Sequence, residues 1–244
     1  MNKIYIIIPA YNEEENIKKV TEDWYKIIDK MTSDSKLVII DDGSKDNTYN
    51  IVKKMKEKYP KLEIITKKNS GHGSTILYGY KYAIENDCNY VFQTDSDGQT
   101  VSNEFWDFWK YKDNYDLIIG NRKNRQDGIS RVIVTKILKL TLFIKFHVWV
   151  KDANTPFRLI KIETLKKYIK LIPKDYHLSN VIISVIYKKF KLKTNYINIT
   201  FKPRQGGKNS INLKRIINIG LKSLKEFSQI NYKLEKELNN NYEI

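Results

Sequence analysis

The sequence predicts an α/β fold, a mostly parallel β-sheet flanked by helices. In the first half of the chain, short apolar runs of β-strand type alternate with segments whose apolar residues recur at helical spacing. Each apolar run ends in a cluster of polar residues, and such clusters meet at one edge of the sheet when the strands are parallel. The expected strands are Ile4–Ile8, Leu37–Ile40, Leu62–Ile65, Tyr90–Gln93 and Leu117–Ile119.

Helices are expected between the first three strands. The second of them follows Asn47 and Thr48, which are residue types that cap helix N-termini. Strands and helices in this order favour a Rossmann-like arrangement, in which ligands bind where the strands end. The apolar residues at helical spacing are Ile17, Val20, Trp24, Ile27, Ile28 and Met31 in the first helix, and Ile51, Val52, Met55 and Tyr59 in the second.

The alternation fades after about residue 125, where longer apolar or amphipathic helices and one late strand, Tyr196–Phe201, are expected. Three lysines interrupt the apolar stretch 132–150, which is interpreted either as a buried helix or as a helix in a membrane interface. The segment 212–228 has apolar residues on one arc and Lys and Arg on the other. It packs on the domain with a solvated basic face, or it lies on an anionic membrane.

The charge is distributed unevenly along the 244 residues. Residues 1–122 carry 18 Lys and Arg against 20 Asp and Glu, whereas residues 123–244 carry 26 against 8. The net charges are therefore −2 and +18, and the basic half is expected to meet nucleic acid, phosphate groups or a membrane surface. The length suits one domain with two halves, 1–125 and 126–230, followed by a polar tail, 231–244, that is expected to fray.

The cysteine content and the lengths of the apolar runs bear on the compartment. A single cysteine, Cys88, excludes an internal disulfide, and a reducing cytoplasm is the simpler expectation. The N-terminus shows no apolar stretch of the signal-peptide kind. No apolar run approaches the roughly 18 uninterrupted residues of a membrane-spanning helix. We therefore expect a cytoplasmic protein.

Two aspartates one residue apart, Asp95 and Asp97, follow the strand Tyr90–Gln93. Two carboxylates at this spacing beyond a strand end can face one cleft, and together they suit a hard divalent cation such as Mg²⁺ or Mn²⁺. Such an ion keeps coordination positions open for substrate phosphates. The same letters, Asp-Ser-Asp-Gly, also form an ordinary turn, so the motif by itself leaves both interpretations open.

Other polar clusters have alternative interpretations too. Asp41 directly follows an apolar strand, a costly place for an unpaired charge, so it is a candidate acceptor for a nucleobase N–H. Glu13 is a candidate ligand of ribose hydroxyls, although acids near helix N-termini also have a capping role. The segment 69–74, "NSGHGS", is typical of a loop that holds an anion at a helix start, but it lacks the full Gly-x-Gly-x-x-Gly pattern.

Four motifs in one order, "PAYNEE", "DDGSKDNT", "GHGSTILYGY" and "QTDSDGQ", make the first half similar to family 2 glycosyltransferases of the GT-A fold. The second half resembles the dolichol-phosphate mannose synthase-like branch more loosely. Its segment 152–160, "DANTPFRLI", has Pro156 where that branch has glycine. Its segment 199–212, "ITFKPRQGGKNSIN", carries matching residue types, but an extra residue shifts the serine and no lysine follows it.

The resemblance implies a nucleotide-diphosphate sugar donor, bound by the half 1–125, and an acceptor side in the half 126–230. It assigns Asp95 and Asp97 to Mg²⁺ or Mn²⁺, and Arg158 and Arg204 to the stabilisation of phosphate charge. The residues that it implies for substrate binding are Pro9, Ala10, Tyr11, Glu13, Asp41, Asp42, Gly71, Ser74, Asp95, Ser96, Gln99, Arg122 and Ser210.

The general base is the open question of the predicted mechanism. Many relatives carry an acid where this chain has Ser179 or Asn180. Either Asp152, Asp175 or His177 is the base for an alcohol acceptor, or the acceptor is a phosphate that is already ionised and needs none. The basic half favours a polyprenyl-phosphate acceptor at the inner face of a membrane, and a saccharide acceptor remains the alternative.

Two other functions are compatible with parts of the pattern. A sugar-phosphate nucleotidyltransferase also uses an α/β fold, acidic metal ligands and a phosphate loop, but it releases pyrophosphate. A nucleic-acid-binding module would use the basic half through salt-dependent phosphate contacts. The acidic strand ends would repel nucleic acid, so we expect no nucleic-acid partner. The sequence leaves the oligomeric state undetermined.

Overall fold

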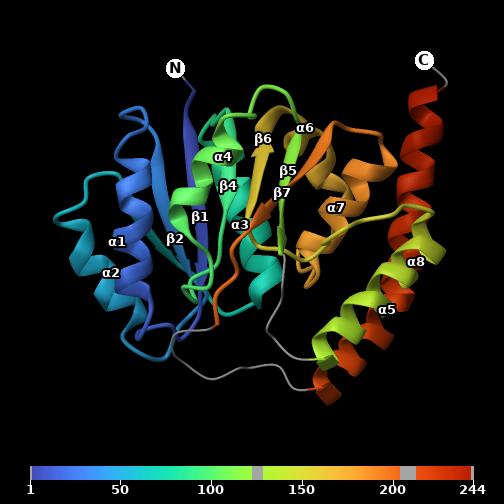
Figure 1. Cartoon of the computed structure of the whole chain (residues 1–244), viewed down its shortest axis with the longest axis horizontal. Helices are drawn as coiled ribbons and strands as arrows, with labels where there is room; N and C mark the ends of the chain where they lie inside the picture. Colours follow the sequence, from blue (N-terminus) through green and yellow to red (C-terminus); the bar gives the residue numbers. More distant parts are fainter. Residues whose placement is uncertain (1, 123–128, 204–212, 243–244) are drawn as a thin grey trace.

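The structure, a computed structural model, describes residues 2–122, 129–203 and 213–242, without the side chains of 129–134, 213–222 and 241–242. Its centre is a seven-stranded sheet of order β3-β2-β1-β4-β6-β5-β7 (Figure 1). β6 is antiparallel to both of its neighbours, and all other pairings are parallel. The strands are β1 (Ile4–Ala10), β2 (Lys36–Asp41), β3 (Leu62–Thr66), β4 (Tyr90–Gln93), β5 (Leu117–Arg122), β6 (Arg158–Lys161) and β7 (Thr194–Ile199).

Helices connect the strands and cover the sheet. The expected alternation of strand and helix, and the mostly parallel sheet, are confirmed. The α-helices are α1 (Ile17–Ile28), α2 (Thr48–Lys56), α3 (His72–Glu85), α4 (Phe105–Trp109), α5 (Ile129–Phe146), α6 (Ile162–Tyr168), α7 (Ser179–Lys189) and α8 (Leu213–Tyr242), with 3₁₀ turns at Ser102–Glu104 and Ile169–Leu171.

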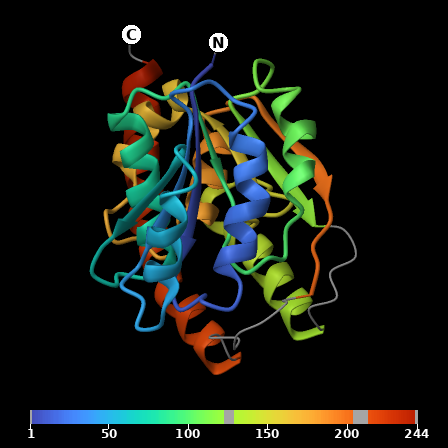
Figure 2. The same ribbon diagram turned by 90° about the vertical axis from the view of Figure 1, so that its left-hand side faces the viewer.

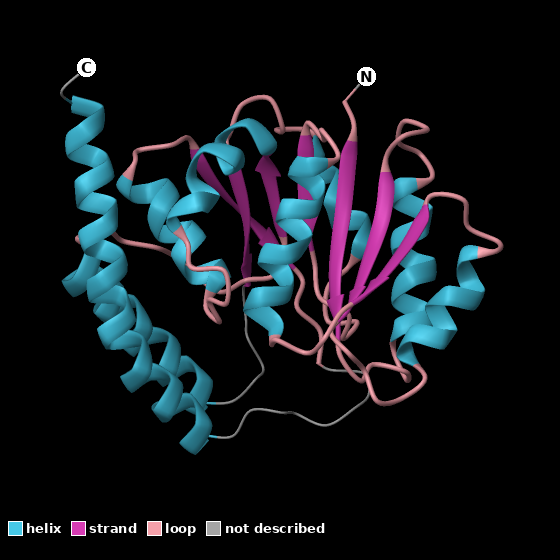
Figure 3. Ribbon diagram, turned by 180° about the vertical axis from the view of Figure 1, so that it is seen from behind, coloured by secondary structure: helices cyan, strands magenta, loops and turns pink. Residues whose placement is uncertain are grey.

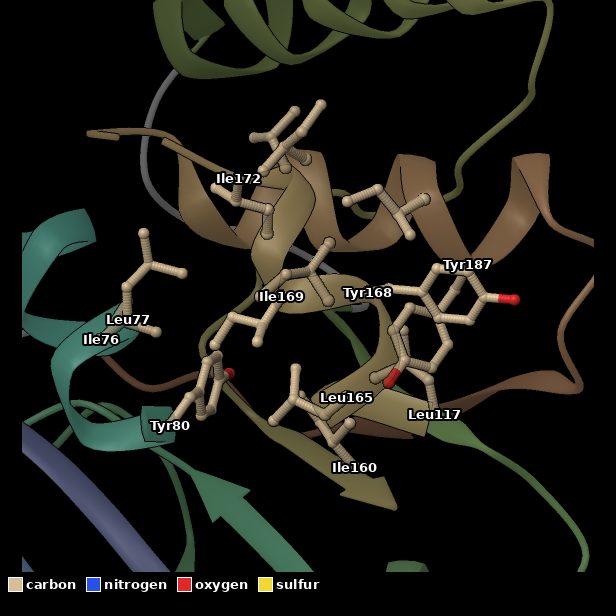
Figure 4. Close-up of a cluster of buried hydrophobic side chains, with 14 of the residues drawn as sticks. Ile76, Leu77, Tyr80, Leu117, Ile160, Leu165, Tyr168, Ile169, Ile172 and Tyr187 are labelled. Atoms are coloured by element: carbon tan, nitrogen blue, oxygen red, sulfur yellow. The ribbon is translucent and has the colours of Figure 1, made fainter. Parts of the chain in front are cut away.

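The alternation of side chains along β1 divides the core into two parts. Ile6 faces a cluster with α1 and α4 that is rich in aromatic rings, including Trp24 and Phe105. Ile7 faces the other cluster, which is closed by α3, α6 and α7 (Figure 4). A strand buried on both faces reads as a continuous apolar run, which is why "IYIII" signalled a central strand.

The structure differs from the sequence-based expectation in three places. β6, a four-residue strand, was not predicted, because a short apolar segment has no periodicity that separates strand from helix. The late strand begins at Thr194 rather than Tyr196, and Phe201 forms only an isolated bridge. The prediction of a frayed tail from residue 231 is wrong, since α8 continues to Tyr242 and Leu234 is buried against the domain.

The two long C-terminal-half helices pack on each other. α5 and α8 are in contact, and the rings of Phe146 and Phe227 meet at a centroid distance of 5.4 Å. The pair extends beyond the edge at which the parallel strands end (Figures 1 and 2). Within the described parts of the chain, no helix combines the length and the apolar character needed to cross a membrane.

Candidate functional site

The polar strand ends gather at one edge of the sheet. β1 lies between β2 and β4 in the sheet. The chain adds β2 and β3 on one side of β1 and then crosses to add β4 on the other side, so the carboxyl ends of β1 and β4 form a topological switch point. Open α/β sheets bind their ligands at such a point, because the loops diverge there and leave a crevice. The five predicted clusters, after β1, β2, β3, β4 and β5, therefore lie along a common edge.

The candidate nucleoside residues lie at the end of β1. Pro9 and Ala10 are its last residues, and Ala10 pairs with Asp41 of β2. Tyr11 is 43% exposed, whereas Glu13 is nearly buried and its carboxylate accepts a hydrogen bond from the Asn16 side chain at 2.9 Å. A pocket of about 310 Å³ adjoins this turn and is lined by residues 12–16, Lys45 and Asp46.

Asp41 is buried at the end of β2, yet it is well hydrogen-bonded. Its carboxylate accepts the Ser44 backbone N–H at 3.1 Å and the Thr66 hydroxyl at 2.7 Å. Gly43 follows with a φ of +69°, and a Cβ there would lie 3.0 Å from the backbone of residues 67 and 69. The turn after β2 therefore needs glycine, and it holds the Asp41 side chain beside the end of β1.

Asp42 organises the next loop. Its carboxylate accepts the backbone N–H groups of Ser70 and Gly71, both at 2.9 Å, and forms an ion pair with Lys67. These three donors engage both oxygens of Asp42, so its carboxylate positions the loop, and the substrate contact predicted for it stays a prediction. Ser74, also predicted to bind substrate, lies in the first turn of α3 and accepts a hydrogen bond from the Ser70 side chain of the loop at 3.1 Å.

The glycine-containing loop and the start of α3 are tightly packed. Gly71 has a φ of +90°, which favours glycine. A Cβ on Gly73 would lie closer than 3.0 Å to the His177 carbonyl, and Ser179 donates a hydrogen bond to the Gly73 carbonyl at 2.7 Å. The sequence gives no local signal for Gly73, because the need for a small residue there comes from a contact with residues about 100 positions away.

Asp95 and Asp97 occupy the turn after β4. The Oδ1 atom of Asp95 is buried and forms no hydrogen bond within the described parts of the chain, and His72 Nε2 lies 3.5 Å away. Burial raises the pKa of the Asp95 carboxyl, and the charges of His72 and Arg122 oppose the increase. Asp97 accepts the Gln99 backbone N–H at 3.1 Å.

This turn suits a divalent cation. A buried carboxylate oxygen without a hydrogen-bond donor is stabilised by a cation, and oxygen ligands suit Mg²⁺ and Mn²⁺. No group of three or more His, Cys, Asp and Glu side chains within the described ranges could hold a metal. Metal–diphosphate sites use only one or two carboxylates of the protein, and water and substrate oxygens complete the coordination of the ion.

Gln99 joins the turn after β4 to the segment after β7. Its side chain donates to the Lys202 carbonyl at 2.8 Å, and the Lys202 N–H donates back to the Gln99 carbonyl at the same distance. A pocket of about 390 Å³ lies here between α1 and this segment and reaches Asp95. Ser96, in the same turn, is buried. Arg204 and Ser210 lie outside the described residues.

Arg122 and Asp152 form an ion pair at the end of β5. The guanidinium donates from Nε to Oδ2 at 2.9 Å and from Nη2 to Oδ1 at 2.8 Å. It also lies over the Phe201 ring, 5.0 Å from the centroid. Arg122 is thus fixed at the edge of the site. The carboxylate of Asp152, a candidate base, is already paired with the Arg122 guanidinium.

Arg158 is corrected from a phosphate ligand to a structural residue. It is fully buried, and its guanidinium donates to the carbonyls of Ala153, Thr155 and Asn180 and to the Ser184 hydroxyl. Burial lowers its pKa to about 10, so it remains charged at neutral pH. These bonds tie the segment 153–158 to α7 and engage the guanidinium of Arg158 within the protein.

The other two candidate bases lie before α7. Asp175 is exposed, whereas His177 is in contact with α8 through both ring nitrogens. Nε2 lies 3.3 Å from the Ser223 hydroxyl, and Nδ1 lies 3.6 Å from the Glu226 carboxylate. Asn180, where many relatives carry an acid, has its side chain buried in the first turn of α7.

The chain matches the family model described as "Glycosyl transferase family 2" over residues 5–169, which is more than half of its length. An uncharacterized protein from Methanocaldococcus jannaschii is 34% identical over 171 residues, covering 66% of this chain and 72% of that protein. A UDP-N-acetylglucosamine–dolichyl-phosphate N-acetylglucosaminyltransferase from Methanococcus voltae is 30% identical over 217 residues, covering 80% and 84%.

A third relative, the undecaprenyl-phosphate 4-deoxy-4-formamido-L-arabinose transferase of Proteus mirabilis, is 24% identical over 222 residues. The match covers 90% of this chain, which spans about two thirds (66%) of that enzyme. Among solved structures, glucosyl-3-phosphoglycerate synthase from Mycobacterium tuberculosis with Mn²⁺, UDP-glucose and phosphoglyceric acid superposes with a TM-score of 0.69. It is 15% identical and covers 93% of this chain and 80% of its own, a likeness of fold.

The expected GT-A architecture is therefore confirmed, and the family assignment favours neither a nucleotidyltransferase nor a nucleic-acid-binding module. The acidic turn after β4, the switch point of the sheet and the family match over residues 5–169 agree with one another. The chain belongs to glycosyl transferase family 2 and is an enzyme of that family.

Proposed function

We propose that the protein transfers a sugar, with inversion at the anomeric carbon, from a nucleotide-diphosphate sugar to a polyprenyl phosphate. The observation that carries the donor part is the buried Oδ1 of Asp95, which lacks a hydrogen bond in the described structure and lies at the switch point of the sheet. A carboxylate in this state is stabilised by a divalent cation, and the cation in turn binds a diphosphate.

Each half of the chain has a part in this proposal. Residues 1–125 bind the donor: Pro9, Ala10 and Tyr11 line the nucleoside pocket and Asp41 accepts from the base. Asp95 and Asp97 hold Mg²⁺ or Mn²⁺. When bound, the ion supplies the positive charge that stabilises the leaving nucleoside diphosphate. Residues 126–230 bind the acceptor.

Arg122 adds a second positive charge to the donor site. It is fixed by Asp152 and by the Phe201 ring, and its charge acts on Asp95 strongly enough to oppose the increase in that carboxyl's pKa. A guanidinium held in place stabilises developing negative charge without reorganising during the reaction. We therefore assign Arg122 to the diphosphate rather than to the acceptor.

Two of the three candidate bases already have partners, which favours a phosphate acceptor; the third, Asp175, is exposed before α7. Asp152 is bound by Arg122, and His177 contacts Ser223 and Glu226, so neither is placed to take a proton from an alcohol without first breaking these contacts. A phosphate oxygen is already ionised and needs no base. The net charge of +18 in residues 123–244 suits an anionic acceptor at the cytoplasmic face of a membrane.

Product analysis tests both parts of the proposal. The protein is incubated with Mn²⁺, a panel of nucleotide sugars, and either a short-chain polyprenyl phosphate or a saccharide. We expect nucleoside diphosphate and a glycosylated lipid phosphate, with the anomeric configuration inverted in the NMR spectrum. Transfer to the saccharide alone would overturn the acceptor part, and pyrophosphate release from a nucleoside triphosphate with a sugar phosphate would overturn the donor part.

A further inference from the structure

Exposed apolar side chains are concentrated on α5 and its surroundings. Ile137 (59%), Leu140 (56%) and Ile144 (60%) recur at intervals of three and four residues on one face of α5. Phe143 borders this face, and its ring meets that of Trp149, itself 60% exposed, at 6.1 Å. We call these five residues the α5 patch. Side chains at such spacing form a continuous surface, and an apolar surface of this kind marks an interaction site.

The rest of the described surface lacks such a feature. Within the described ranges, only one further Ile, Leu, Phe or Trp side chain is exposed. It is Leu224, on the neighbouring helix α8. The opposite side of α5 is packed in the ordinary way, since Leu142 and Phe146 are buried against the domain. α5 is therefore anchored by one face and leaves the other face without a partner.

The chain around the patch is uniformly basic. Residues 129–151 contain Arg131, Lys136, Lys139, Lys145 and Lys151 and no acidic residue. Lys136 is exposed beside the patch, and Lys145 donates to the Ser228 hydroxyl of α8 at 3.0 Å. Apolar side chains bordered by lysines complement a surface that is apolar below and anionic above, which is the interface of an anionic bilayer.

The patch is connected directly to the candidate site. In the sequence α5 lies between Arg122 and Asp152, and these two residues are joined by the ion pair described above. α5 and the first part of α8 lie side by side, beyond the edge at which the parallel strands end (Figures 1 and 3). Whatever binds the patch is therefore held on the same side of the molecule as the crevice.

We infer that the α5 patch is a membrane-docking surface, with an anionic phospholipid bilayer as its partner. Ile137, Leu140 and Ile144 insert among the acyl chains, Trp149 lies at the headgroup level, and the lysines contact lipid phosphates. A second copy of the chain is a poorer occupant, because the same face on two copies would bring two basic segments together. The inference deepens the proposed function, since a docked α5 presents the crevice to a lipid-borne phosphate.

Vesicle flotation with the full chain tests the inference without any donor or acceptor. The probes are vesicles of phosphatidylcholine alone and vesicles with about one third phosphatidylglycerol. We expect binding to the anionic vesicles and a reduction of at least about tenfold in the partition coefficient for Leu140→Glu/Ile144→Glu. The matched control, Tyr78→Glu/Tyr111→Glu, adds the same charge at side chains that are 41% and 39% exposed elsewhere, and should bind as the wild type does.

Tryptophan fluorescence provides a second readout. Emission should shift to the blue on addition of anionic vesicles, and Trp149→Phe should abolish the shift while most of the binding remains. Of the other three tryptophans, Trp24 is buried, and Trp106 and Trp109 are partly buried in α4 against the aromatic cluster, away from the α5 patch. Equal binding of the wild type and the Leu140→Glu/Ile144→Glu variant would overturn the inference. The inference would also be overturned if the wild type bound no vesicles but formed a dimer that the Leu140→Glu/Ile144→Glu substitutions dissociate. The partner of the patch would then be a second copy of the chain.

The two proposals fail in distinguishable ways. Transfer to a short-chain, water-dispersed polyprenyl phosphate without vesicle binding would overturn the docking surface and leave the proposed function intact. Vesicle binding without transfer to any polyprenyl phosphate would overturn the proposed function and leave the docking surface intact.

Discussion

Arg122 and Asp152 are 30 residues apart in the chain and form a two-pronged ion pair with distances of 2.9 and 2.8 Å. Their side chains are only 9% and 8% exposed. The pair joins the residues that flank α5 in the sequence and fixes a guanidinium at the end of β5. The charge of this guanidinium acts on the Asp95 carboxyl, whose pKa it lowers against the effect of burial.

Removing Asp152 should leave the Arg122 charge nearly buried without its partner. We expect Asp152→Ala to lower the free energy of unfolding by about 3–5 kcal/mol, measured by urea denaturation. In the double variant Arg122→Ala/Asp152→Ala, the loss should be smaller than the sum of the two single losses. Losses that add within about 0.5 kcal/mol would show that the pair is not coupled.

The metal assignment predicts a shared phenotype for Asp95 and Asp97. Asp95→Asn and Asp97→Asn should each lower kcat/KM by at least about 10²-fold, since each removes a negatively charged ligand from the ion that stabilises the leaving group. Both variants should also lose the increase in melting temperature that Mn²⁺ with nucleoside diphosphate gives to the wild type. Asp107→Asn, on the exposed side of α4, is the control; retained metal stabilisation in Asp97→Asn would contradict the assignment.

The raised pKa of Asp95 predicts an effect on stability in the absence of metal. Its folded-state pKa lies above the ordinary value of 3.8 because of burial, so the folded state disfavours the charged form. The stability contributed by the protonated form is lost as the pH rises from 3.8 through the folded-state pKa. With EDTA, Asp95→Asn should therefore melt at a higher temperature than the wild type at pH 7, and the difference should shrink towards pH 4. A less stable variant at pH 7 would contradict this cause.

The buried guanidinium of Arg158 should be required for folding rather than for substrate affinity. Arg158→Lys cannot supply donors to three carbonyls in different directions, so we expect a loss of about 3 kcal/mol or more in the free energy of unfolding. Guanidinium chloride denaturation measures the loss. A variant with wild-type stability and a raised KM for the nucleotide sugar would instead place Arg158 in contact with the substrate.

The contact between α3 and the loop before α7 predicts a strict size limit at residue 73. Gly73→Ala places a methyl group against the His177 carbonyl, and we expect a loss of about 1–3 kcal/mol in stability together with reduced activity. Tyr78→Ala on the exposed face of the same helix controls for the change in helix composition. If Gly73→Ala leaves both stability and activity unchanged, this contact does not position the loop.

The sequence alone determined the repeating order of strand and helix, the parallel direction of most strands and the edge at which the polar clusters meet. These properties follow from local periodicity and from the geometry of strand–helix–strand units. The acidic turn of Asp95 and Asp97 and the family resemblance were read from short contiguous motifs. Local pattern was sufficient because each of these features lies within a few consecutive residues.

Only the tertiary structure decided what the individual charges do. Asp42 and Arg158 have the residue types and sequence positions of ligand contacts. In the structure the Asp42 carboxylate accepts the Gly71 backbone N–H, and the Arg158 guanidinium donates to backbone carbonyls of two segments. β6 joins the sheet through pairings with β4 and β5, and α8 continues to Tyr242 because Leu234 is buried against the domain. Each outcome depends on partners distant in sequence, and the free energy of a buried charge or a short strand is set by those partners rather than by its neighbours in the chain.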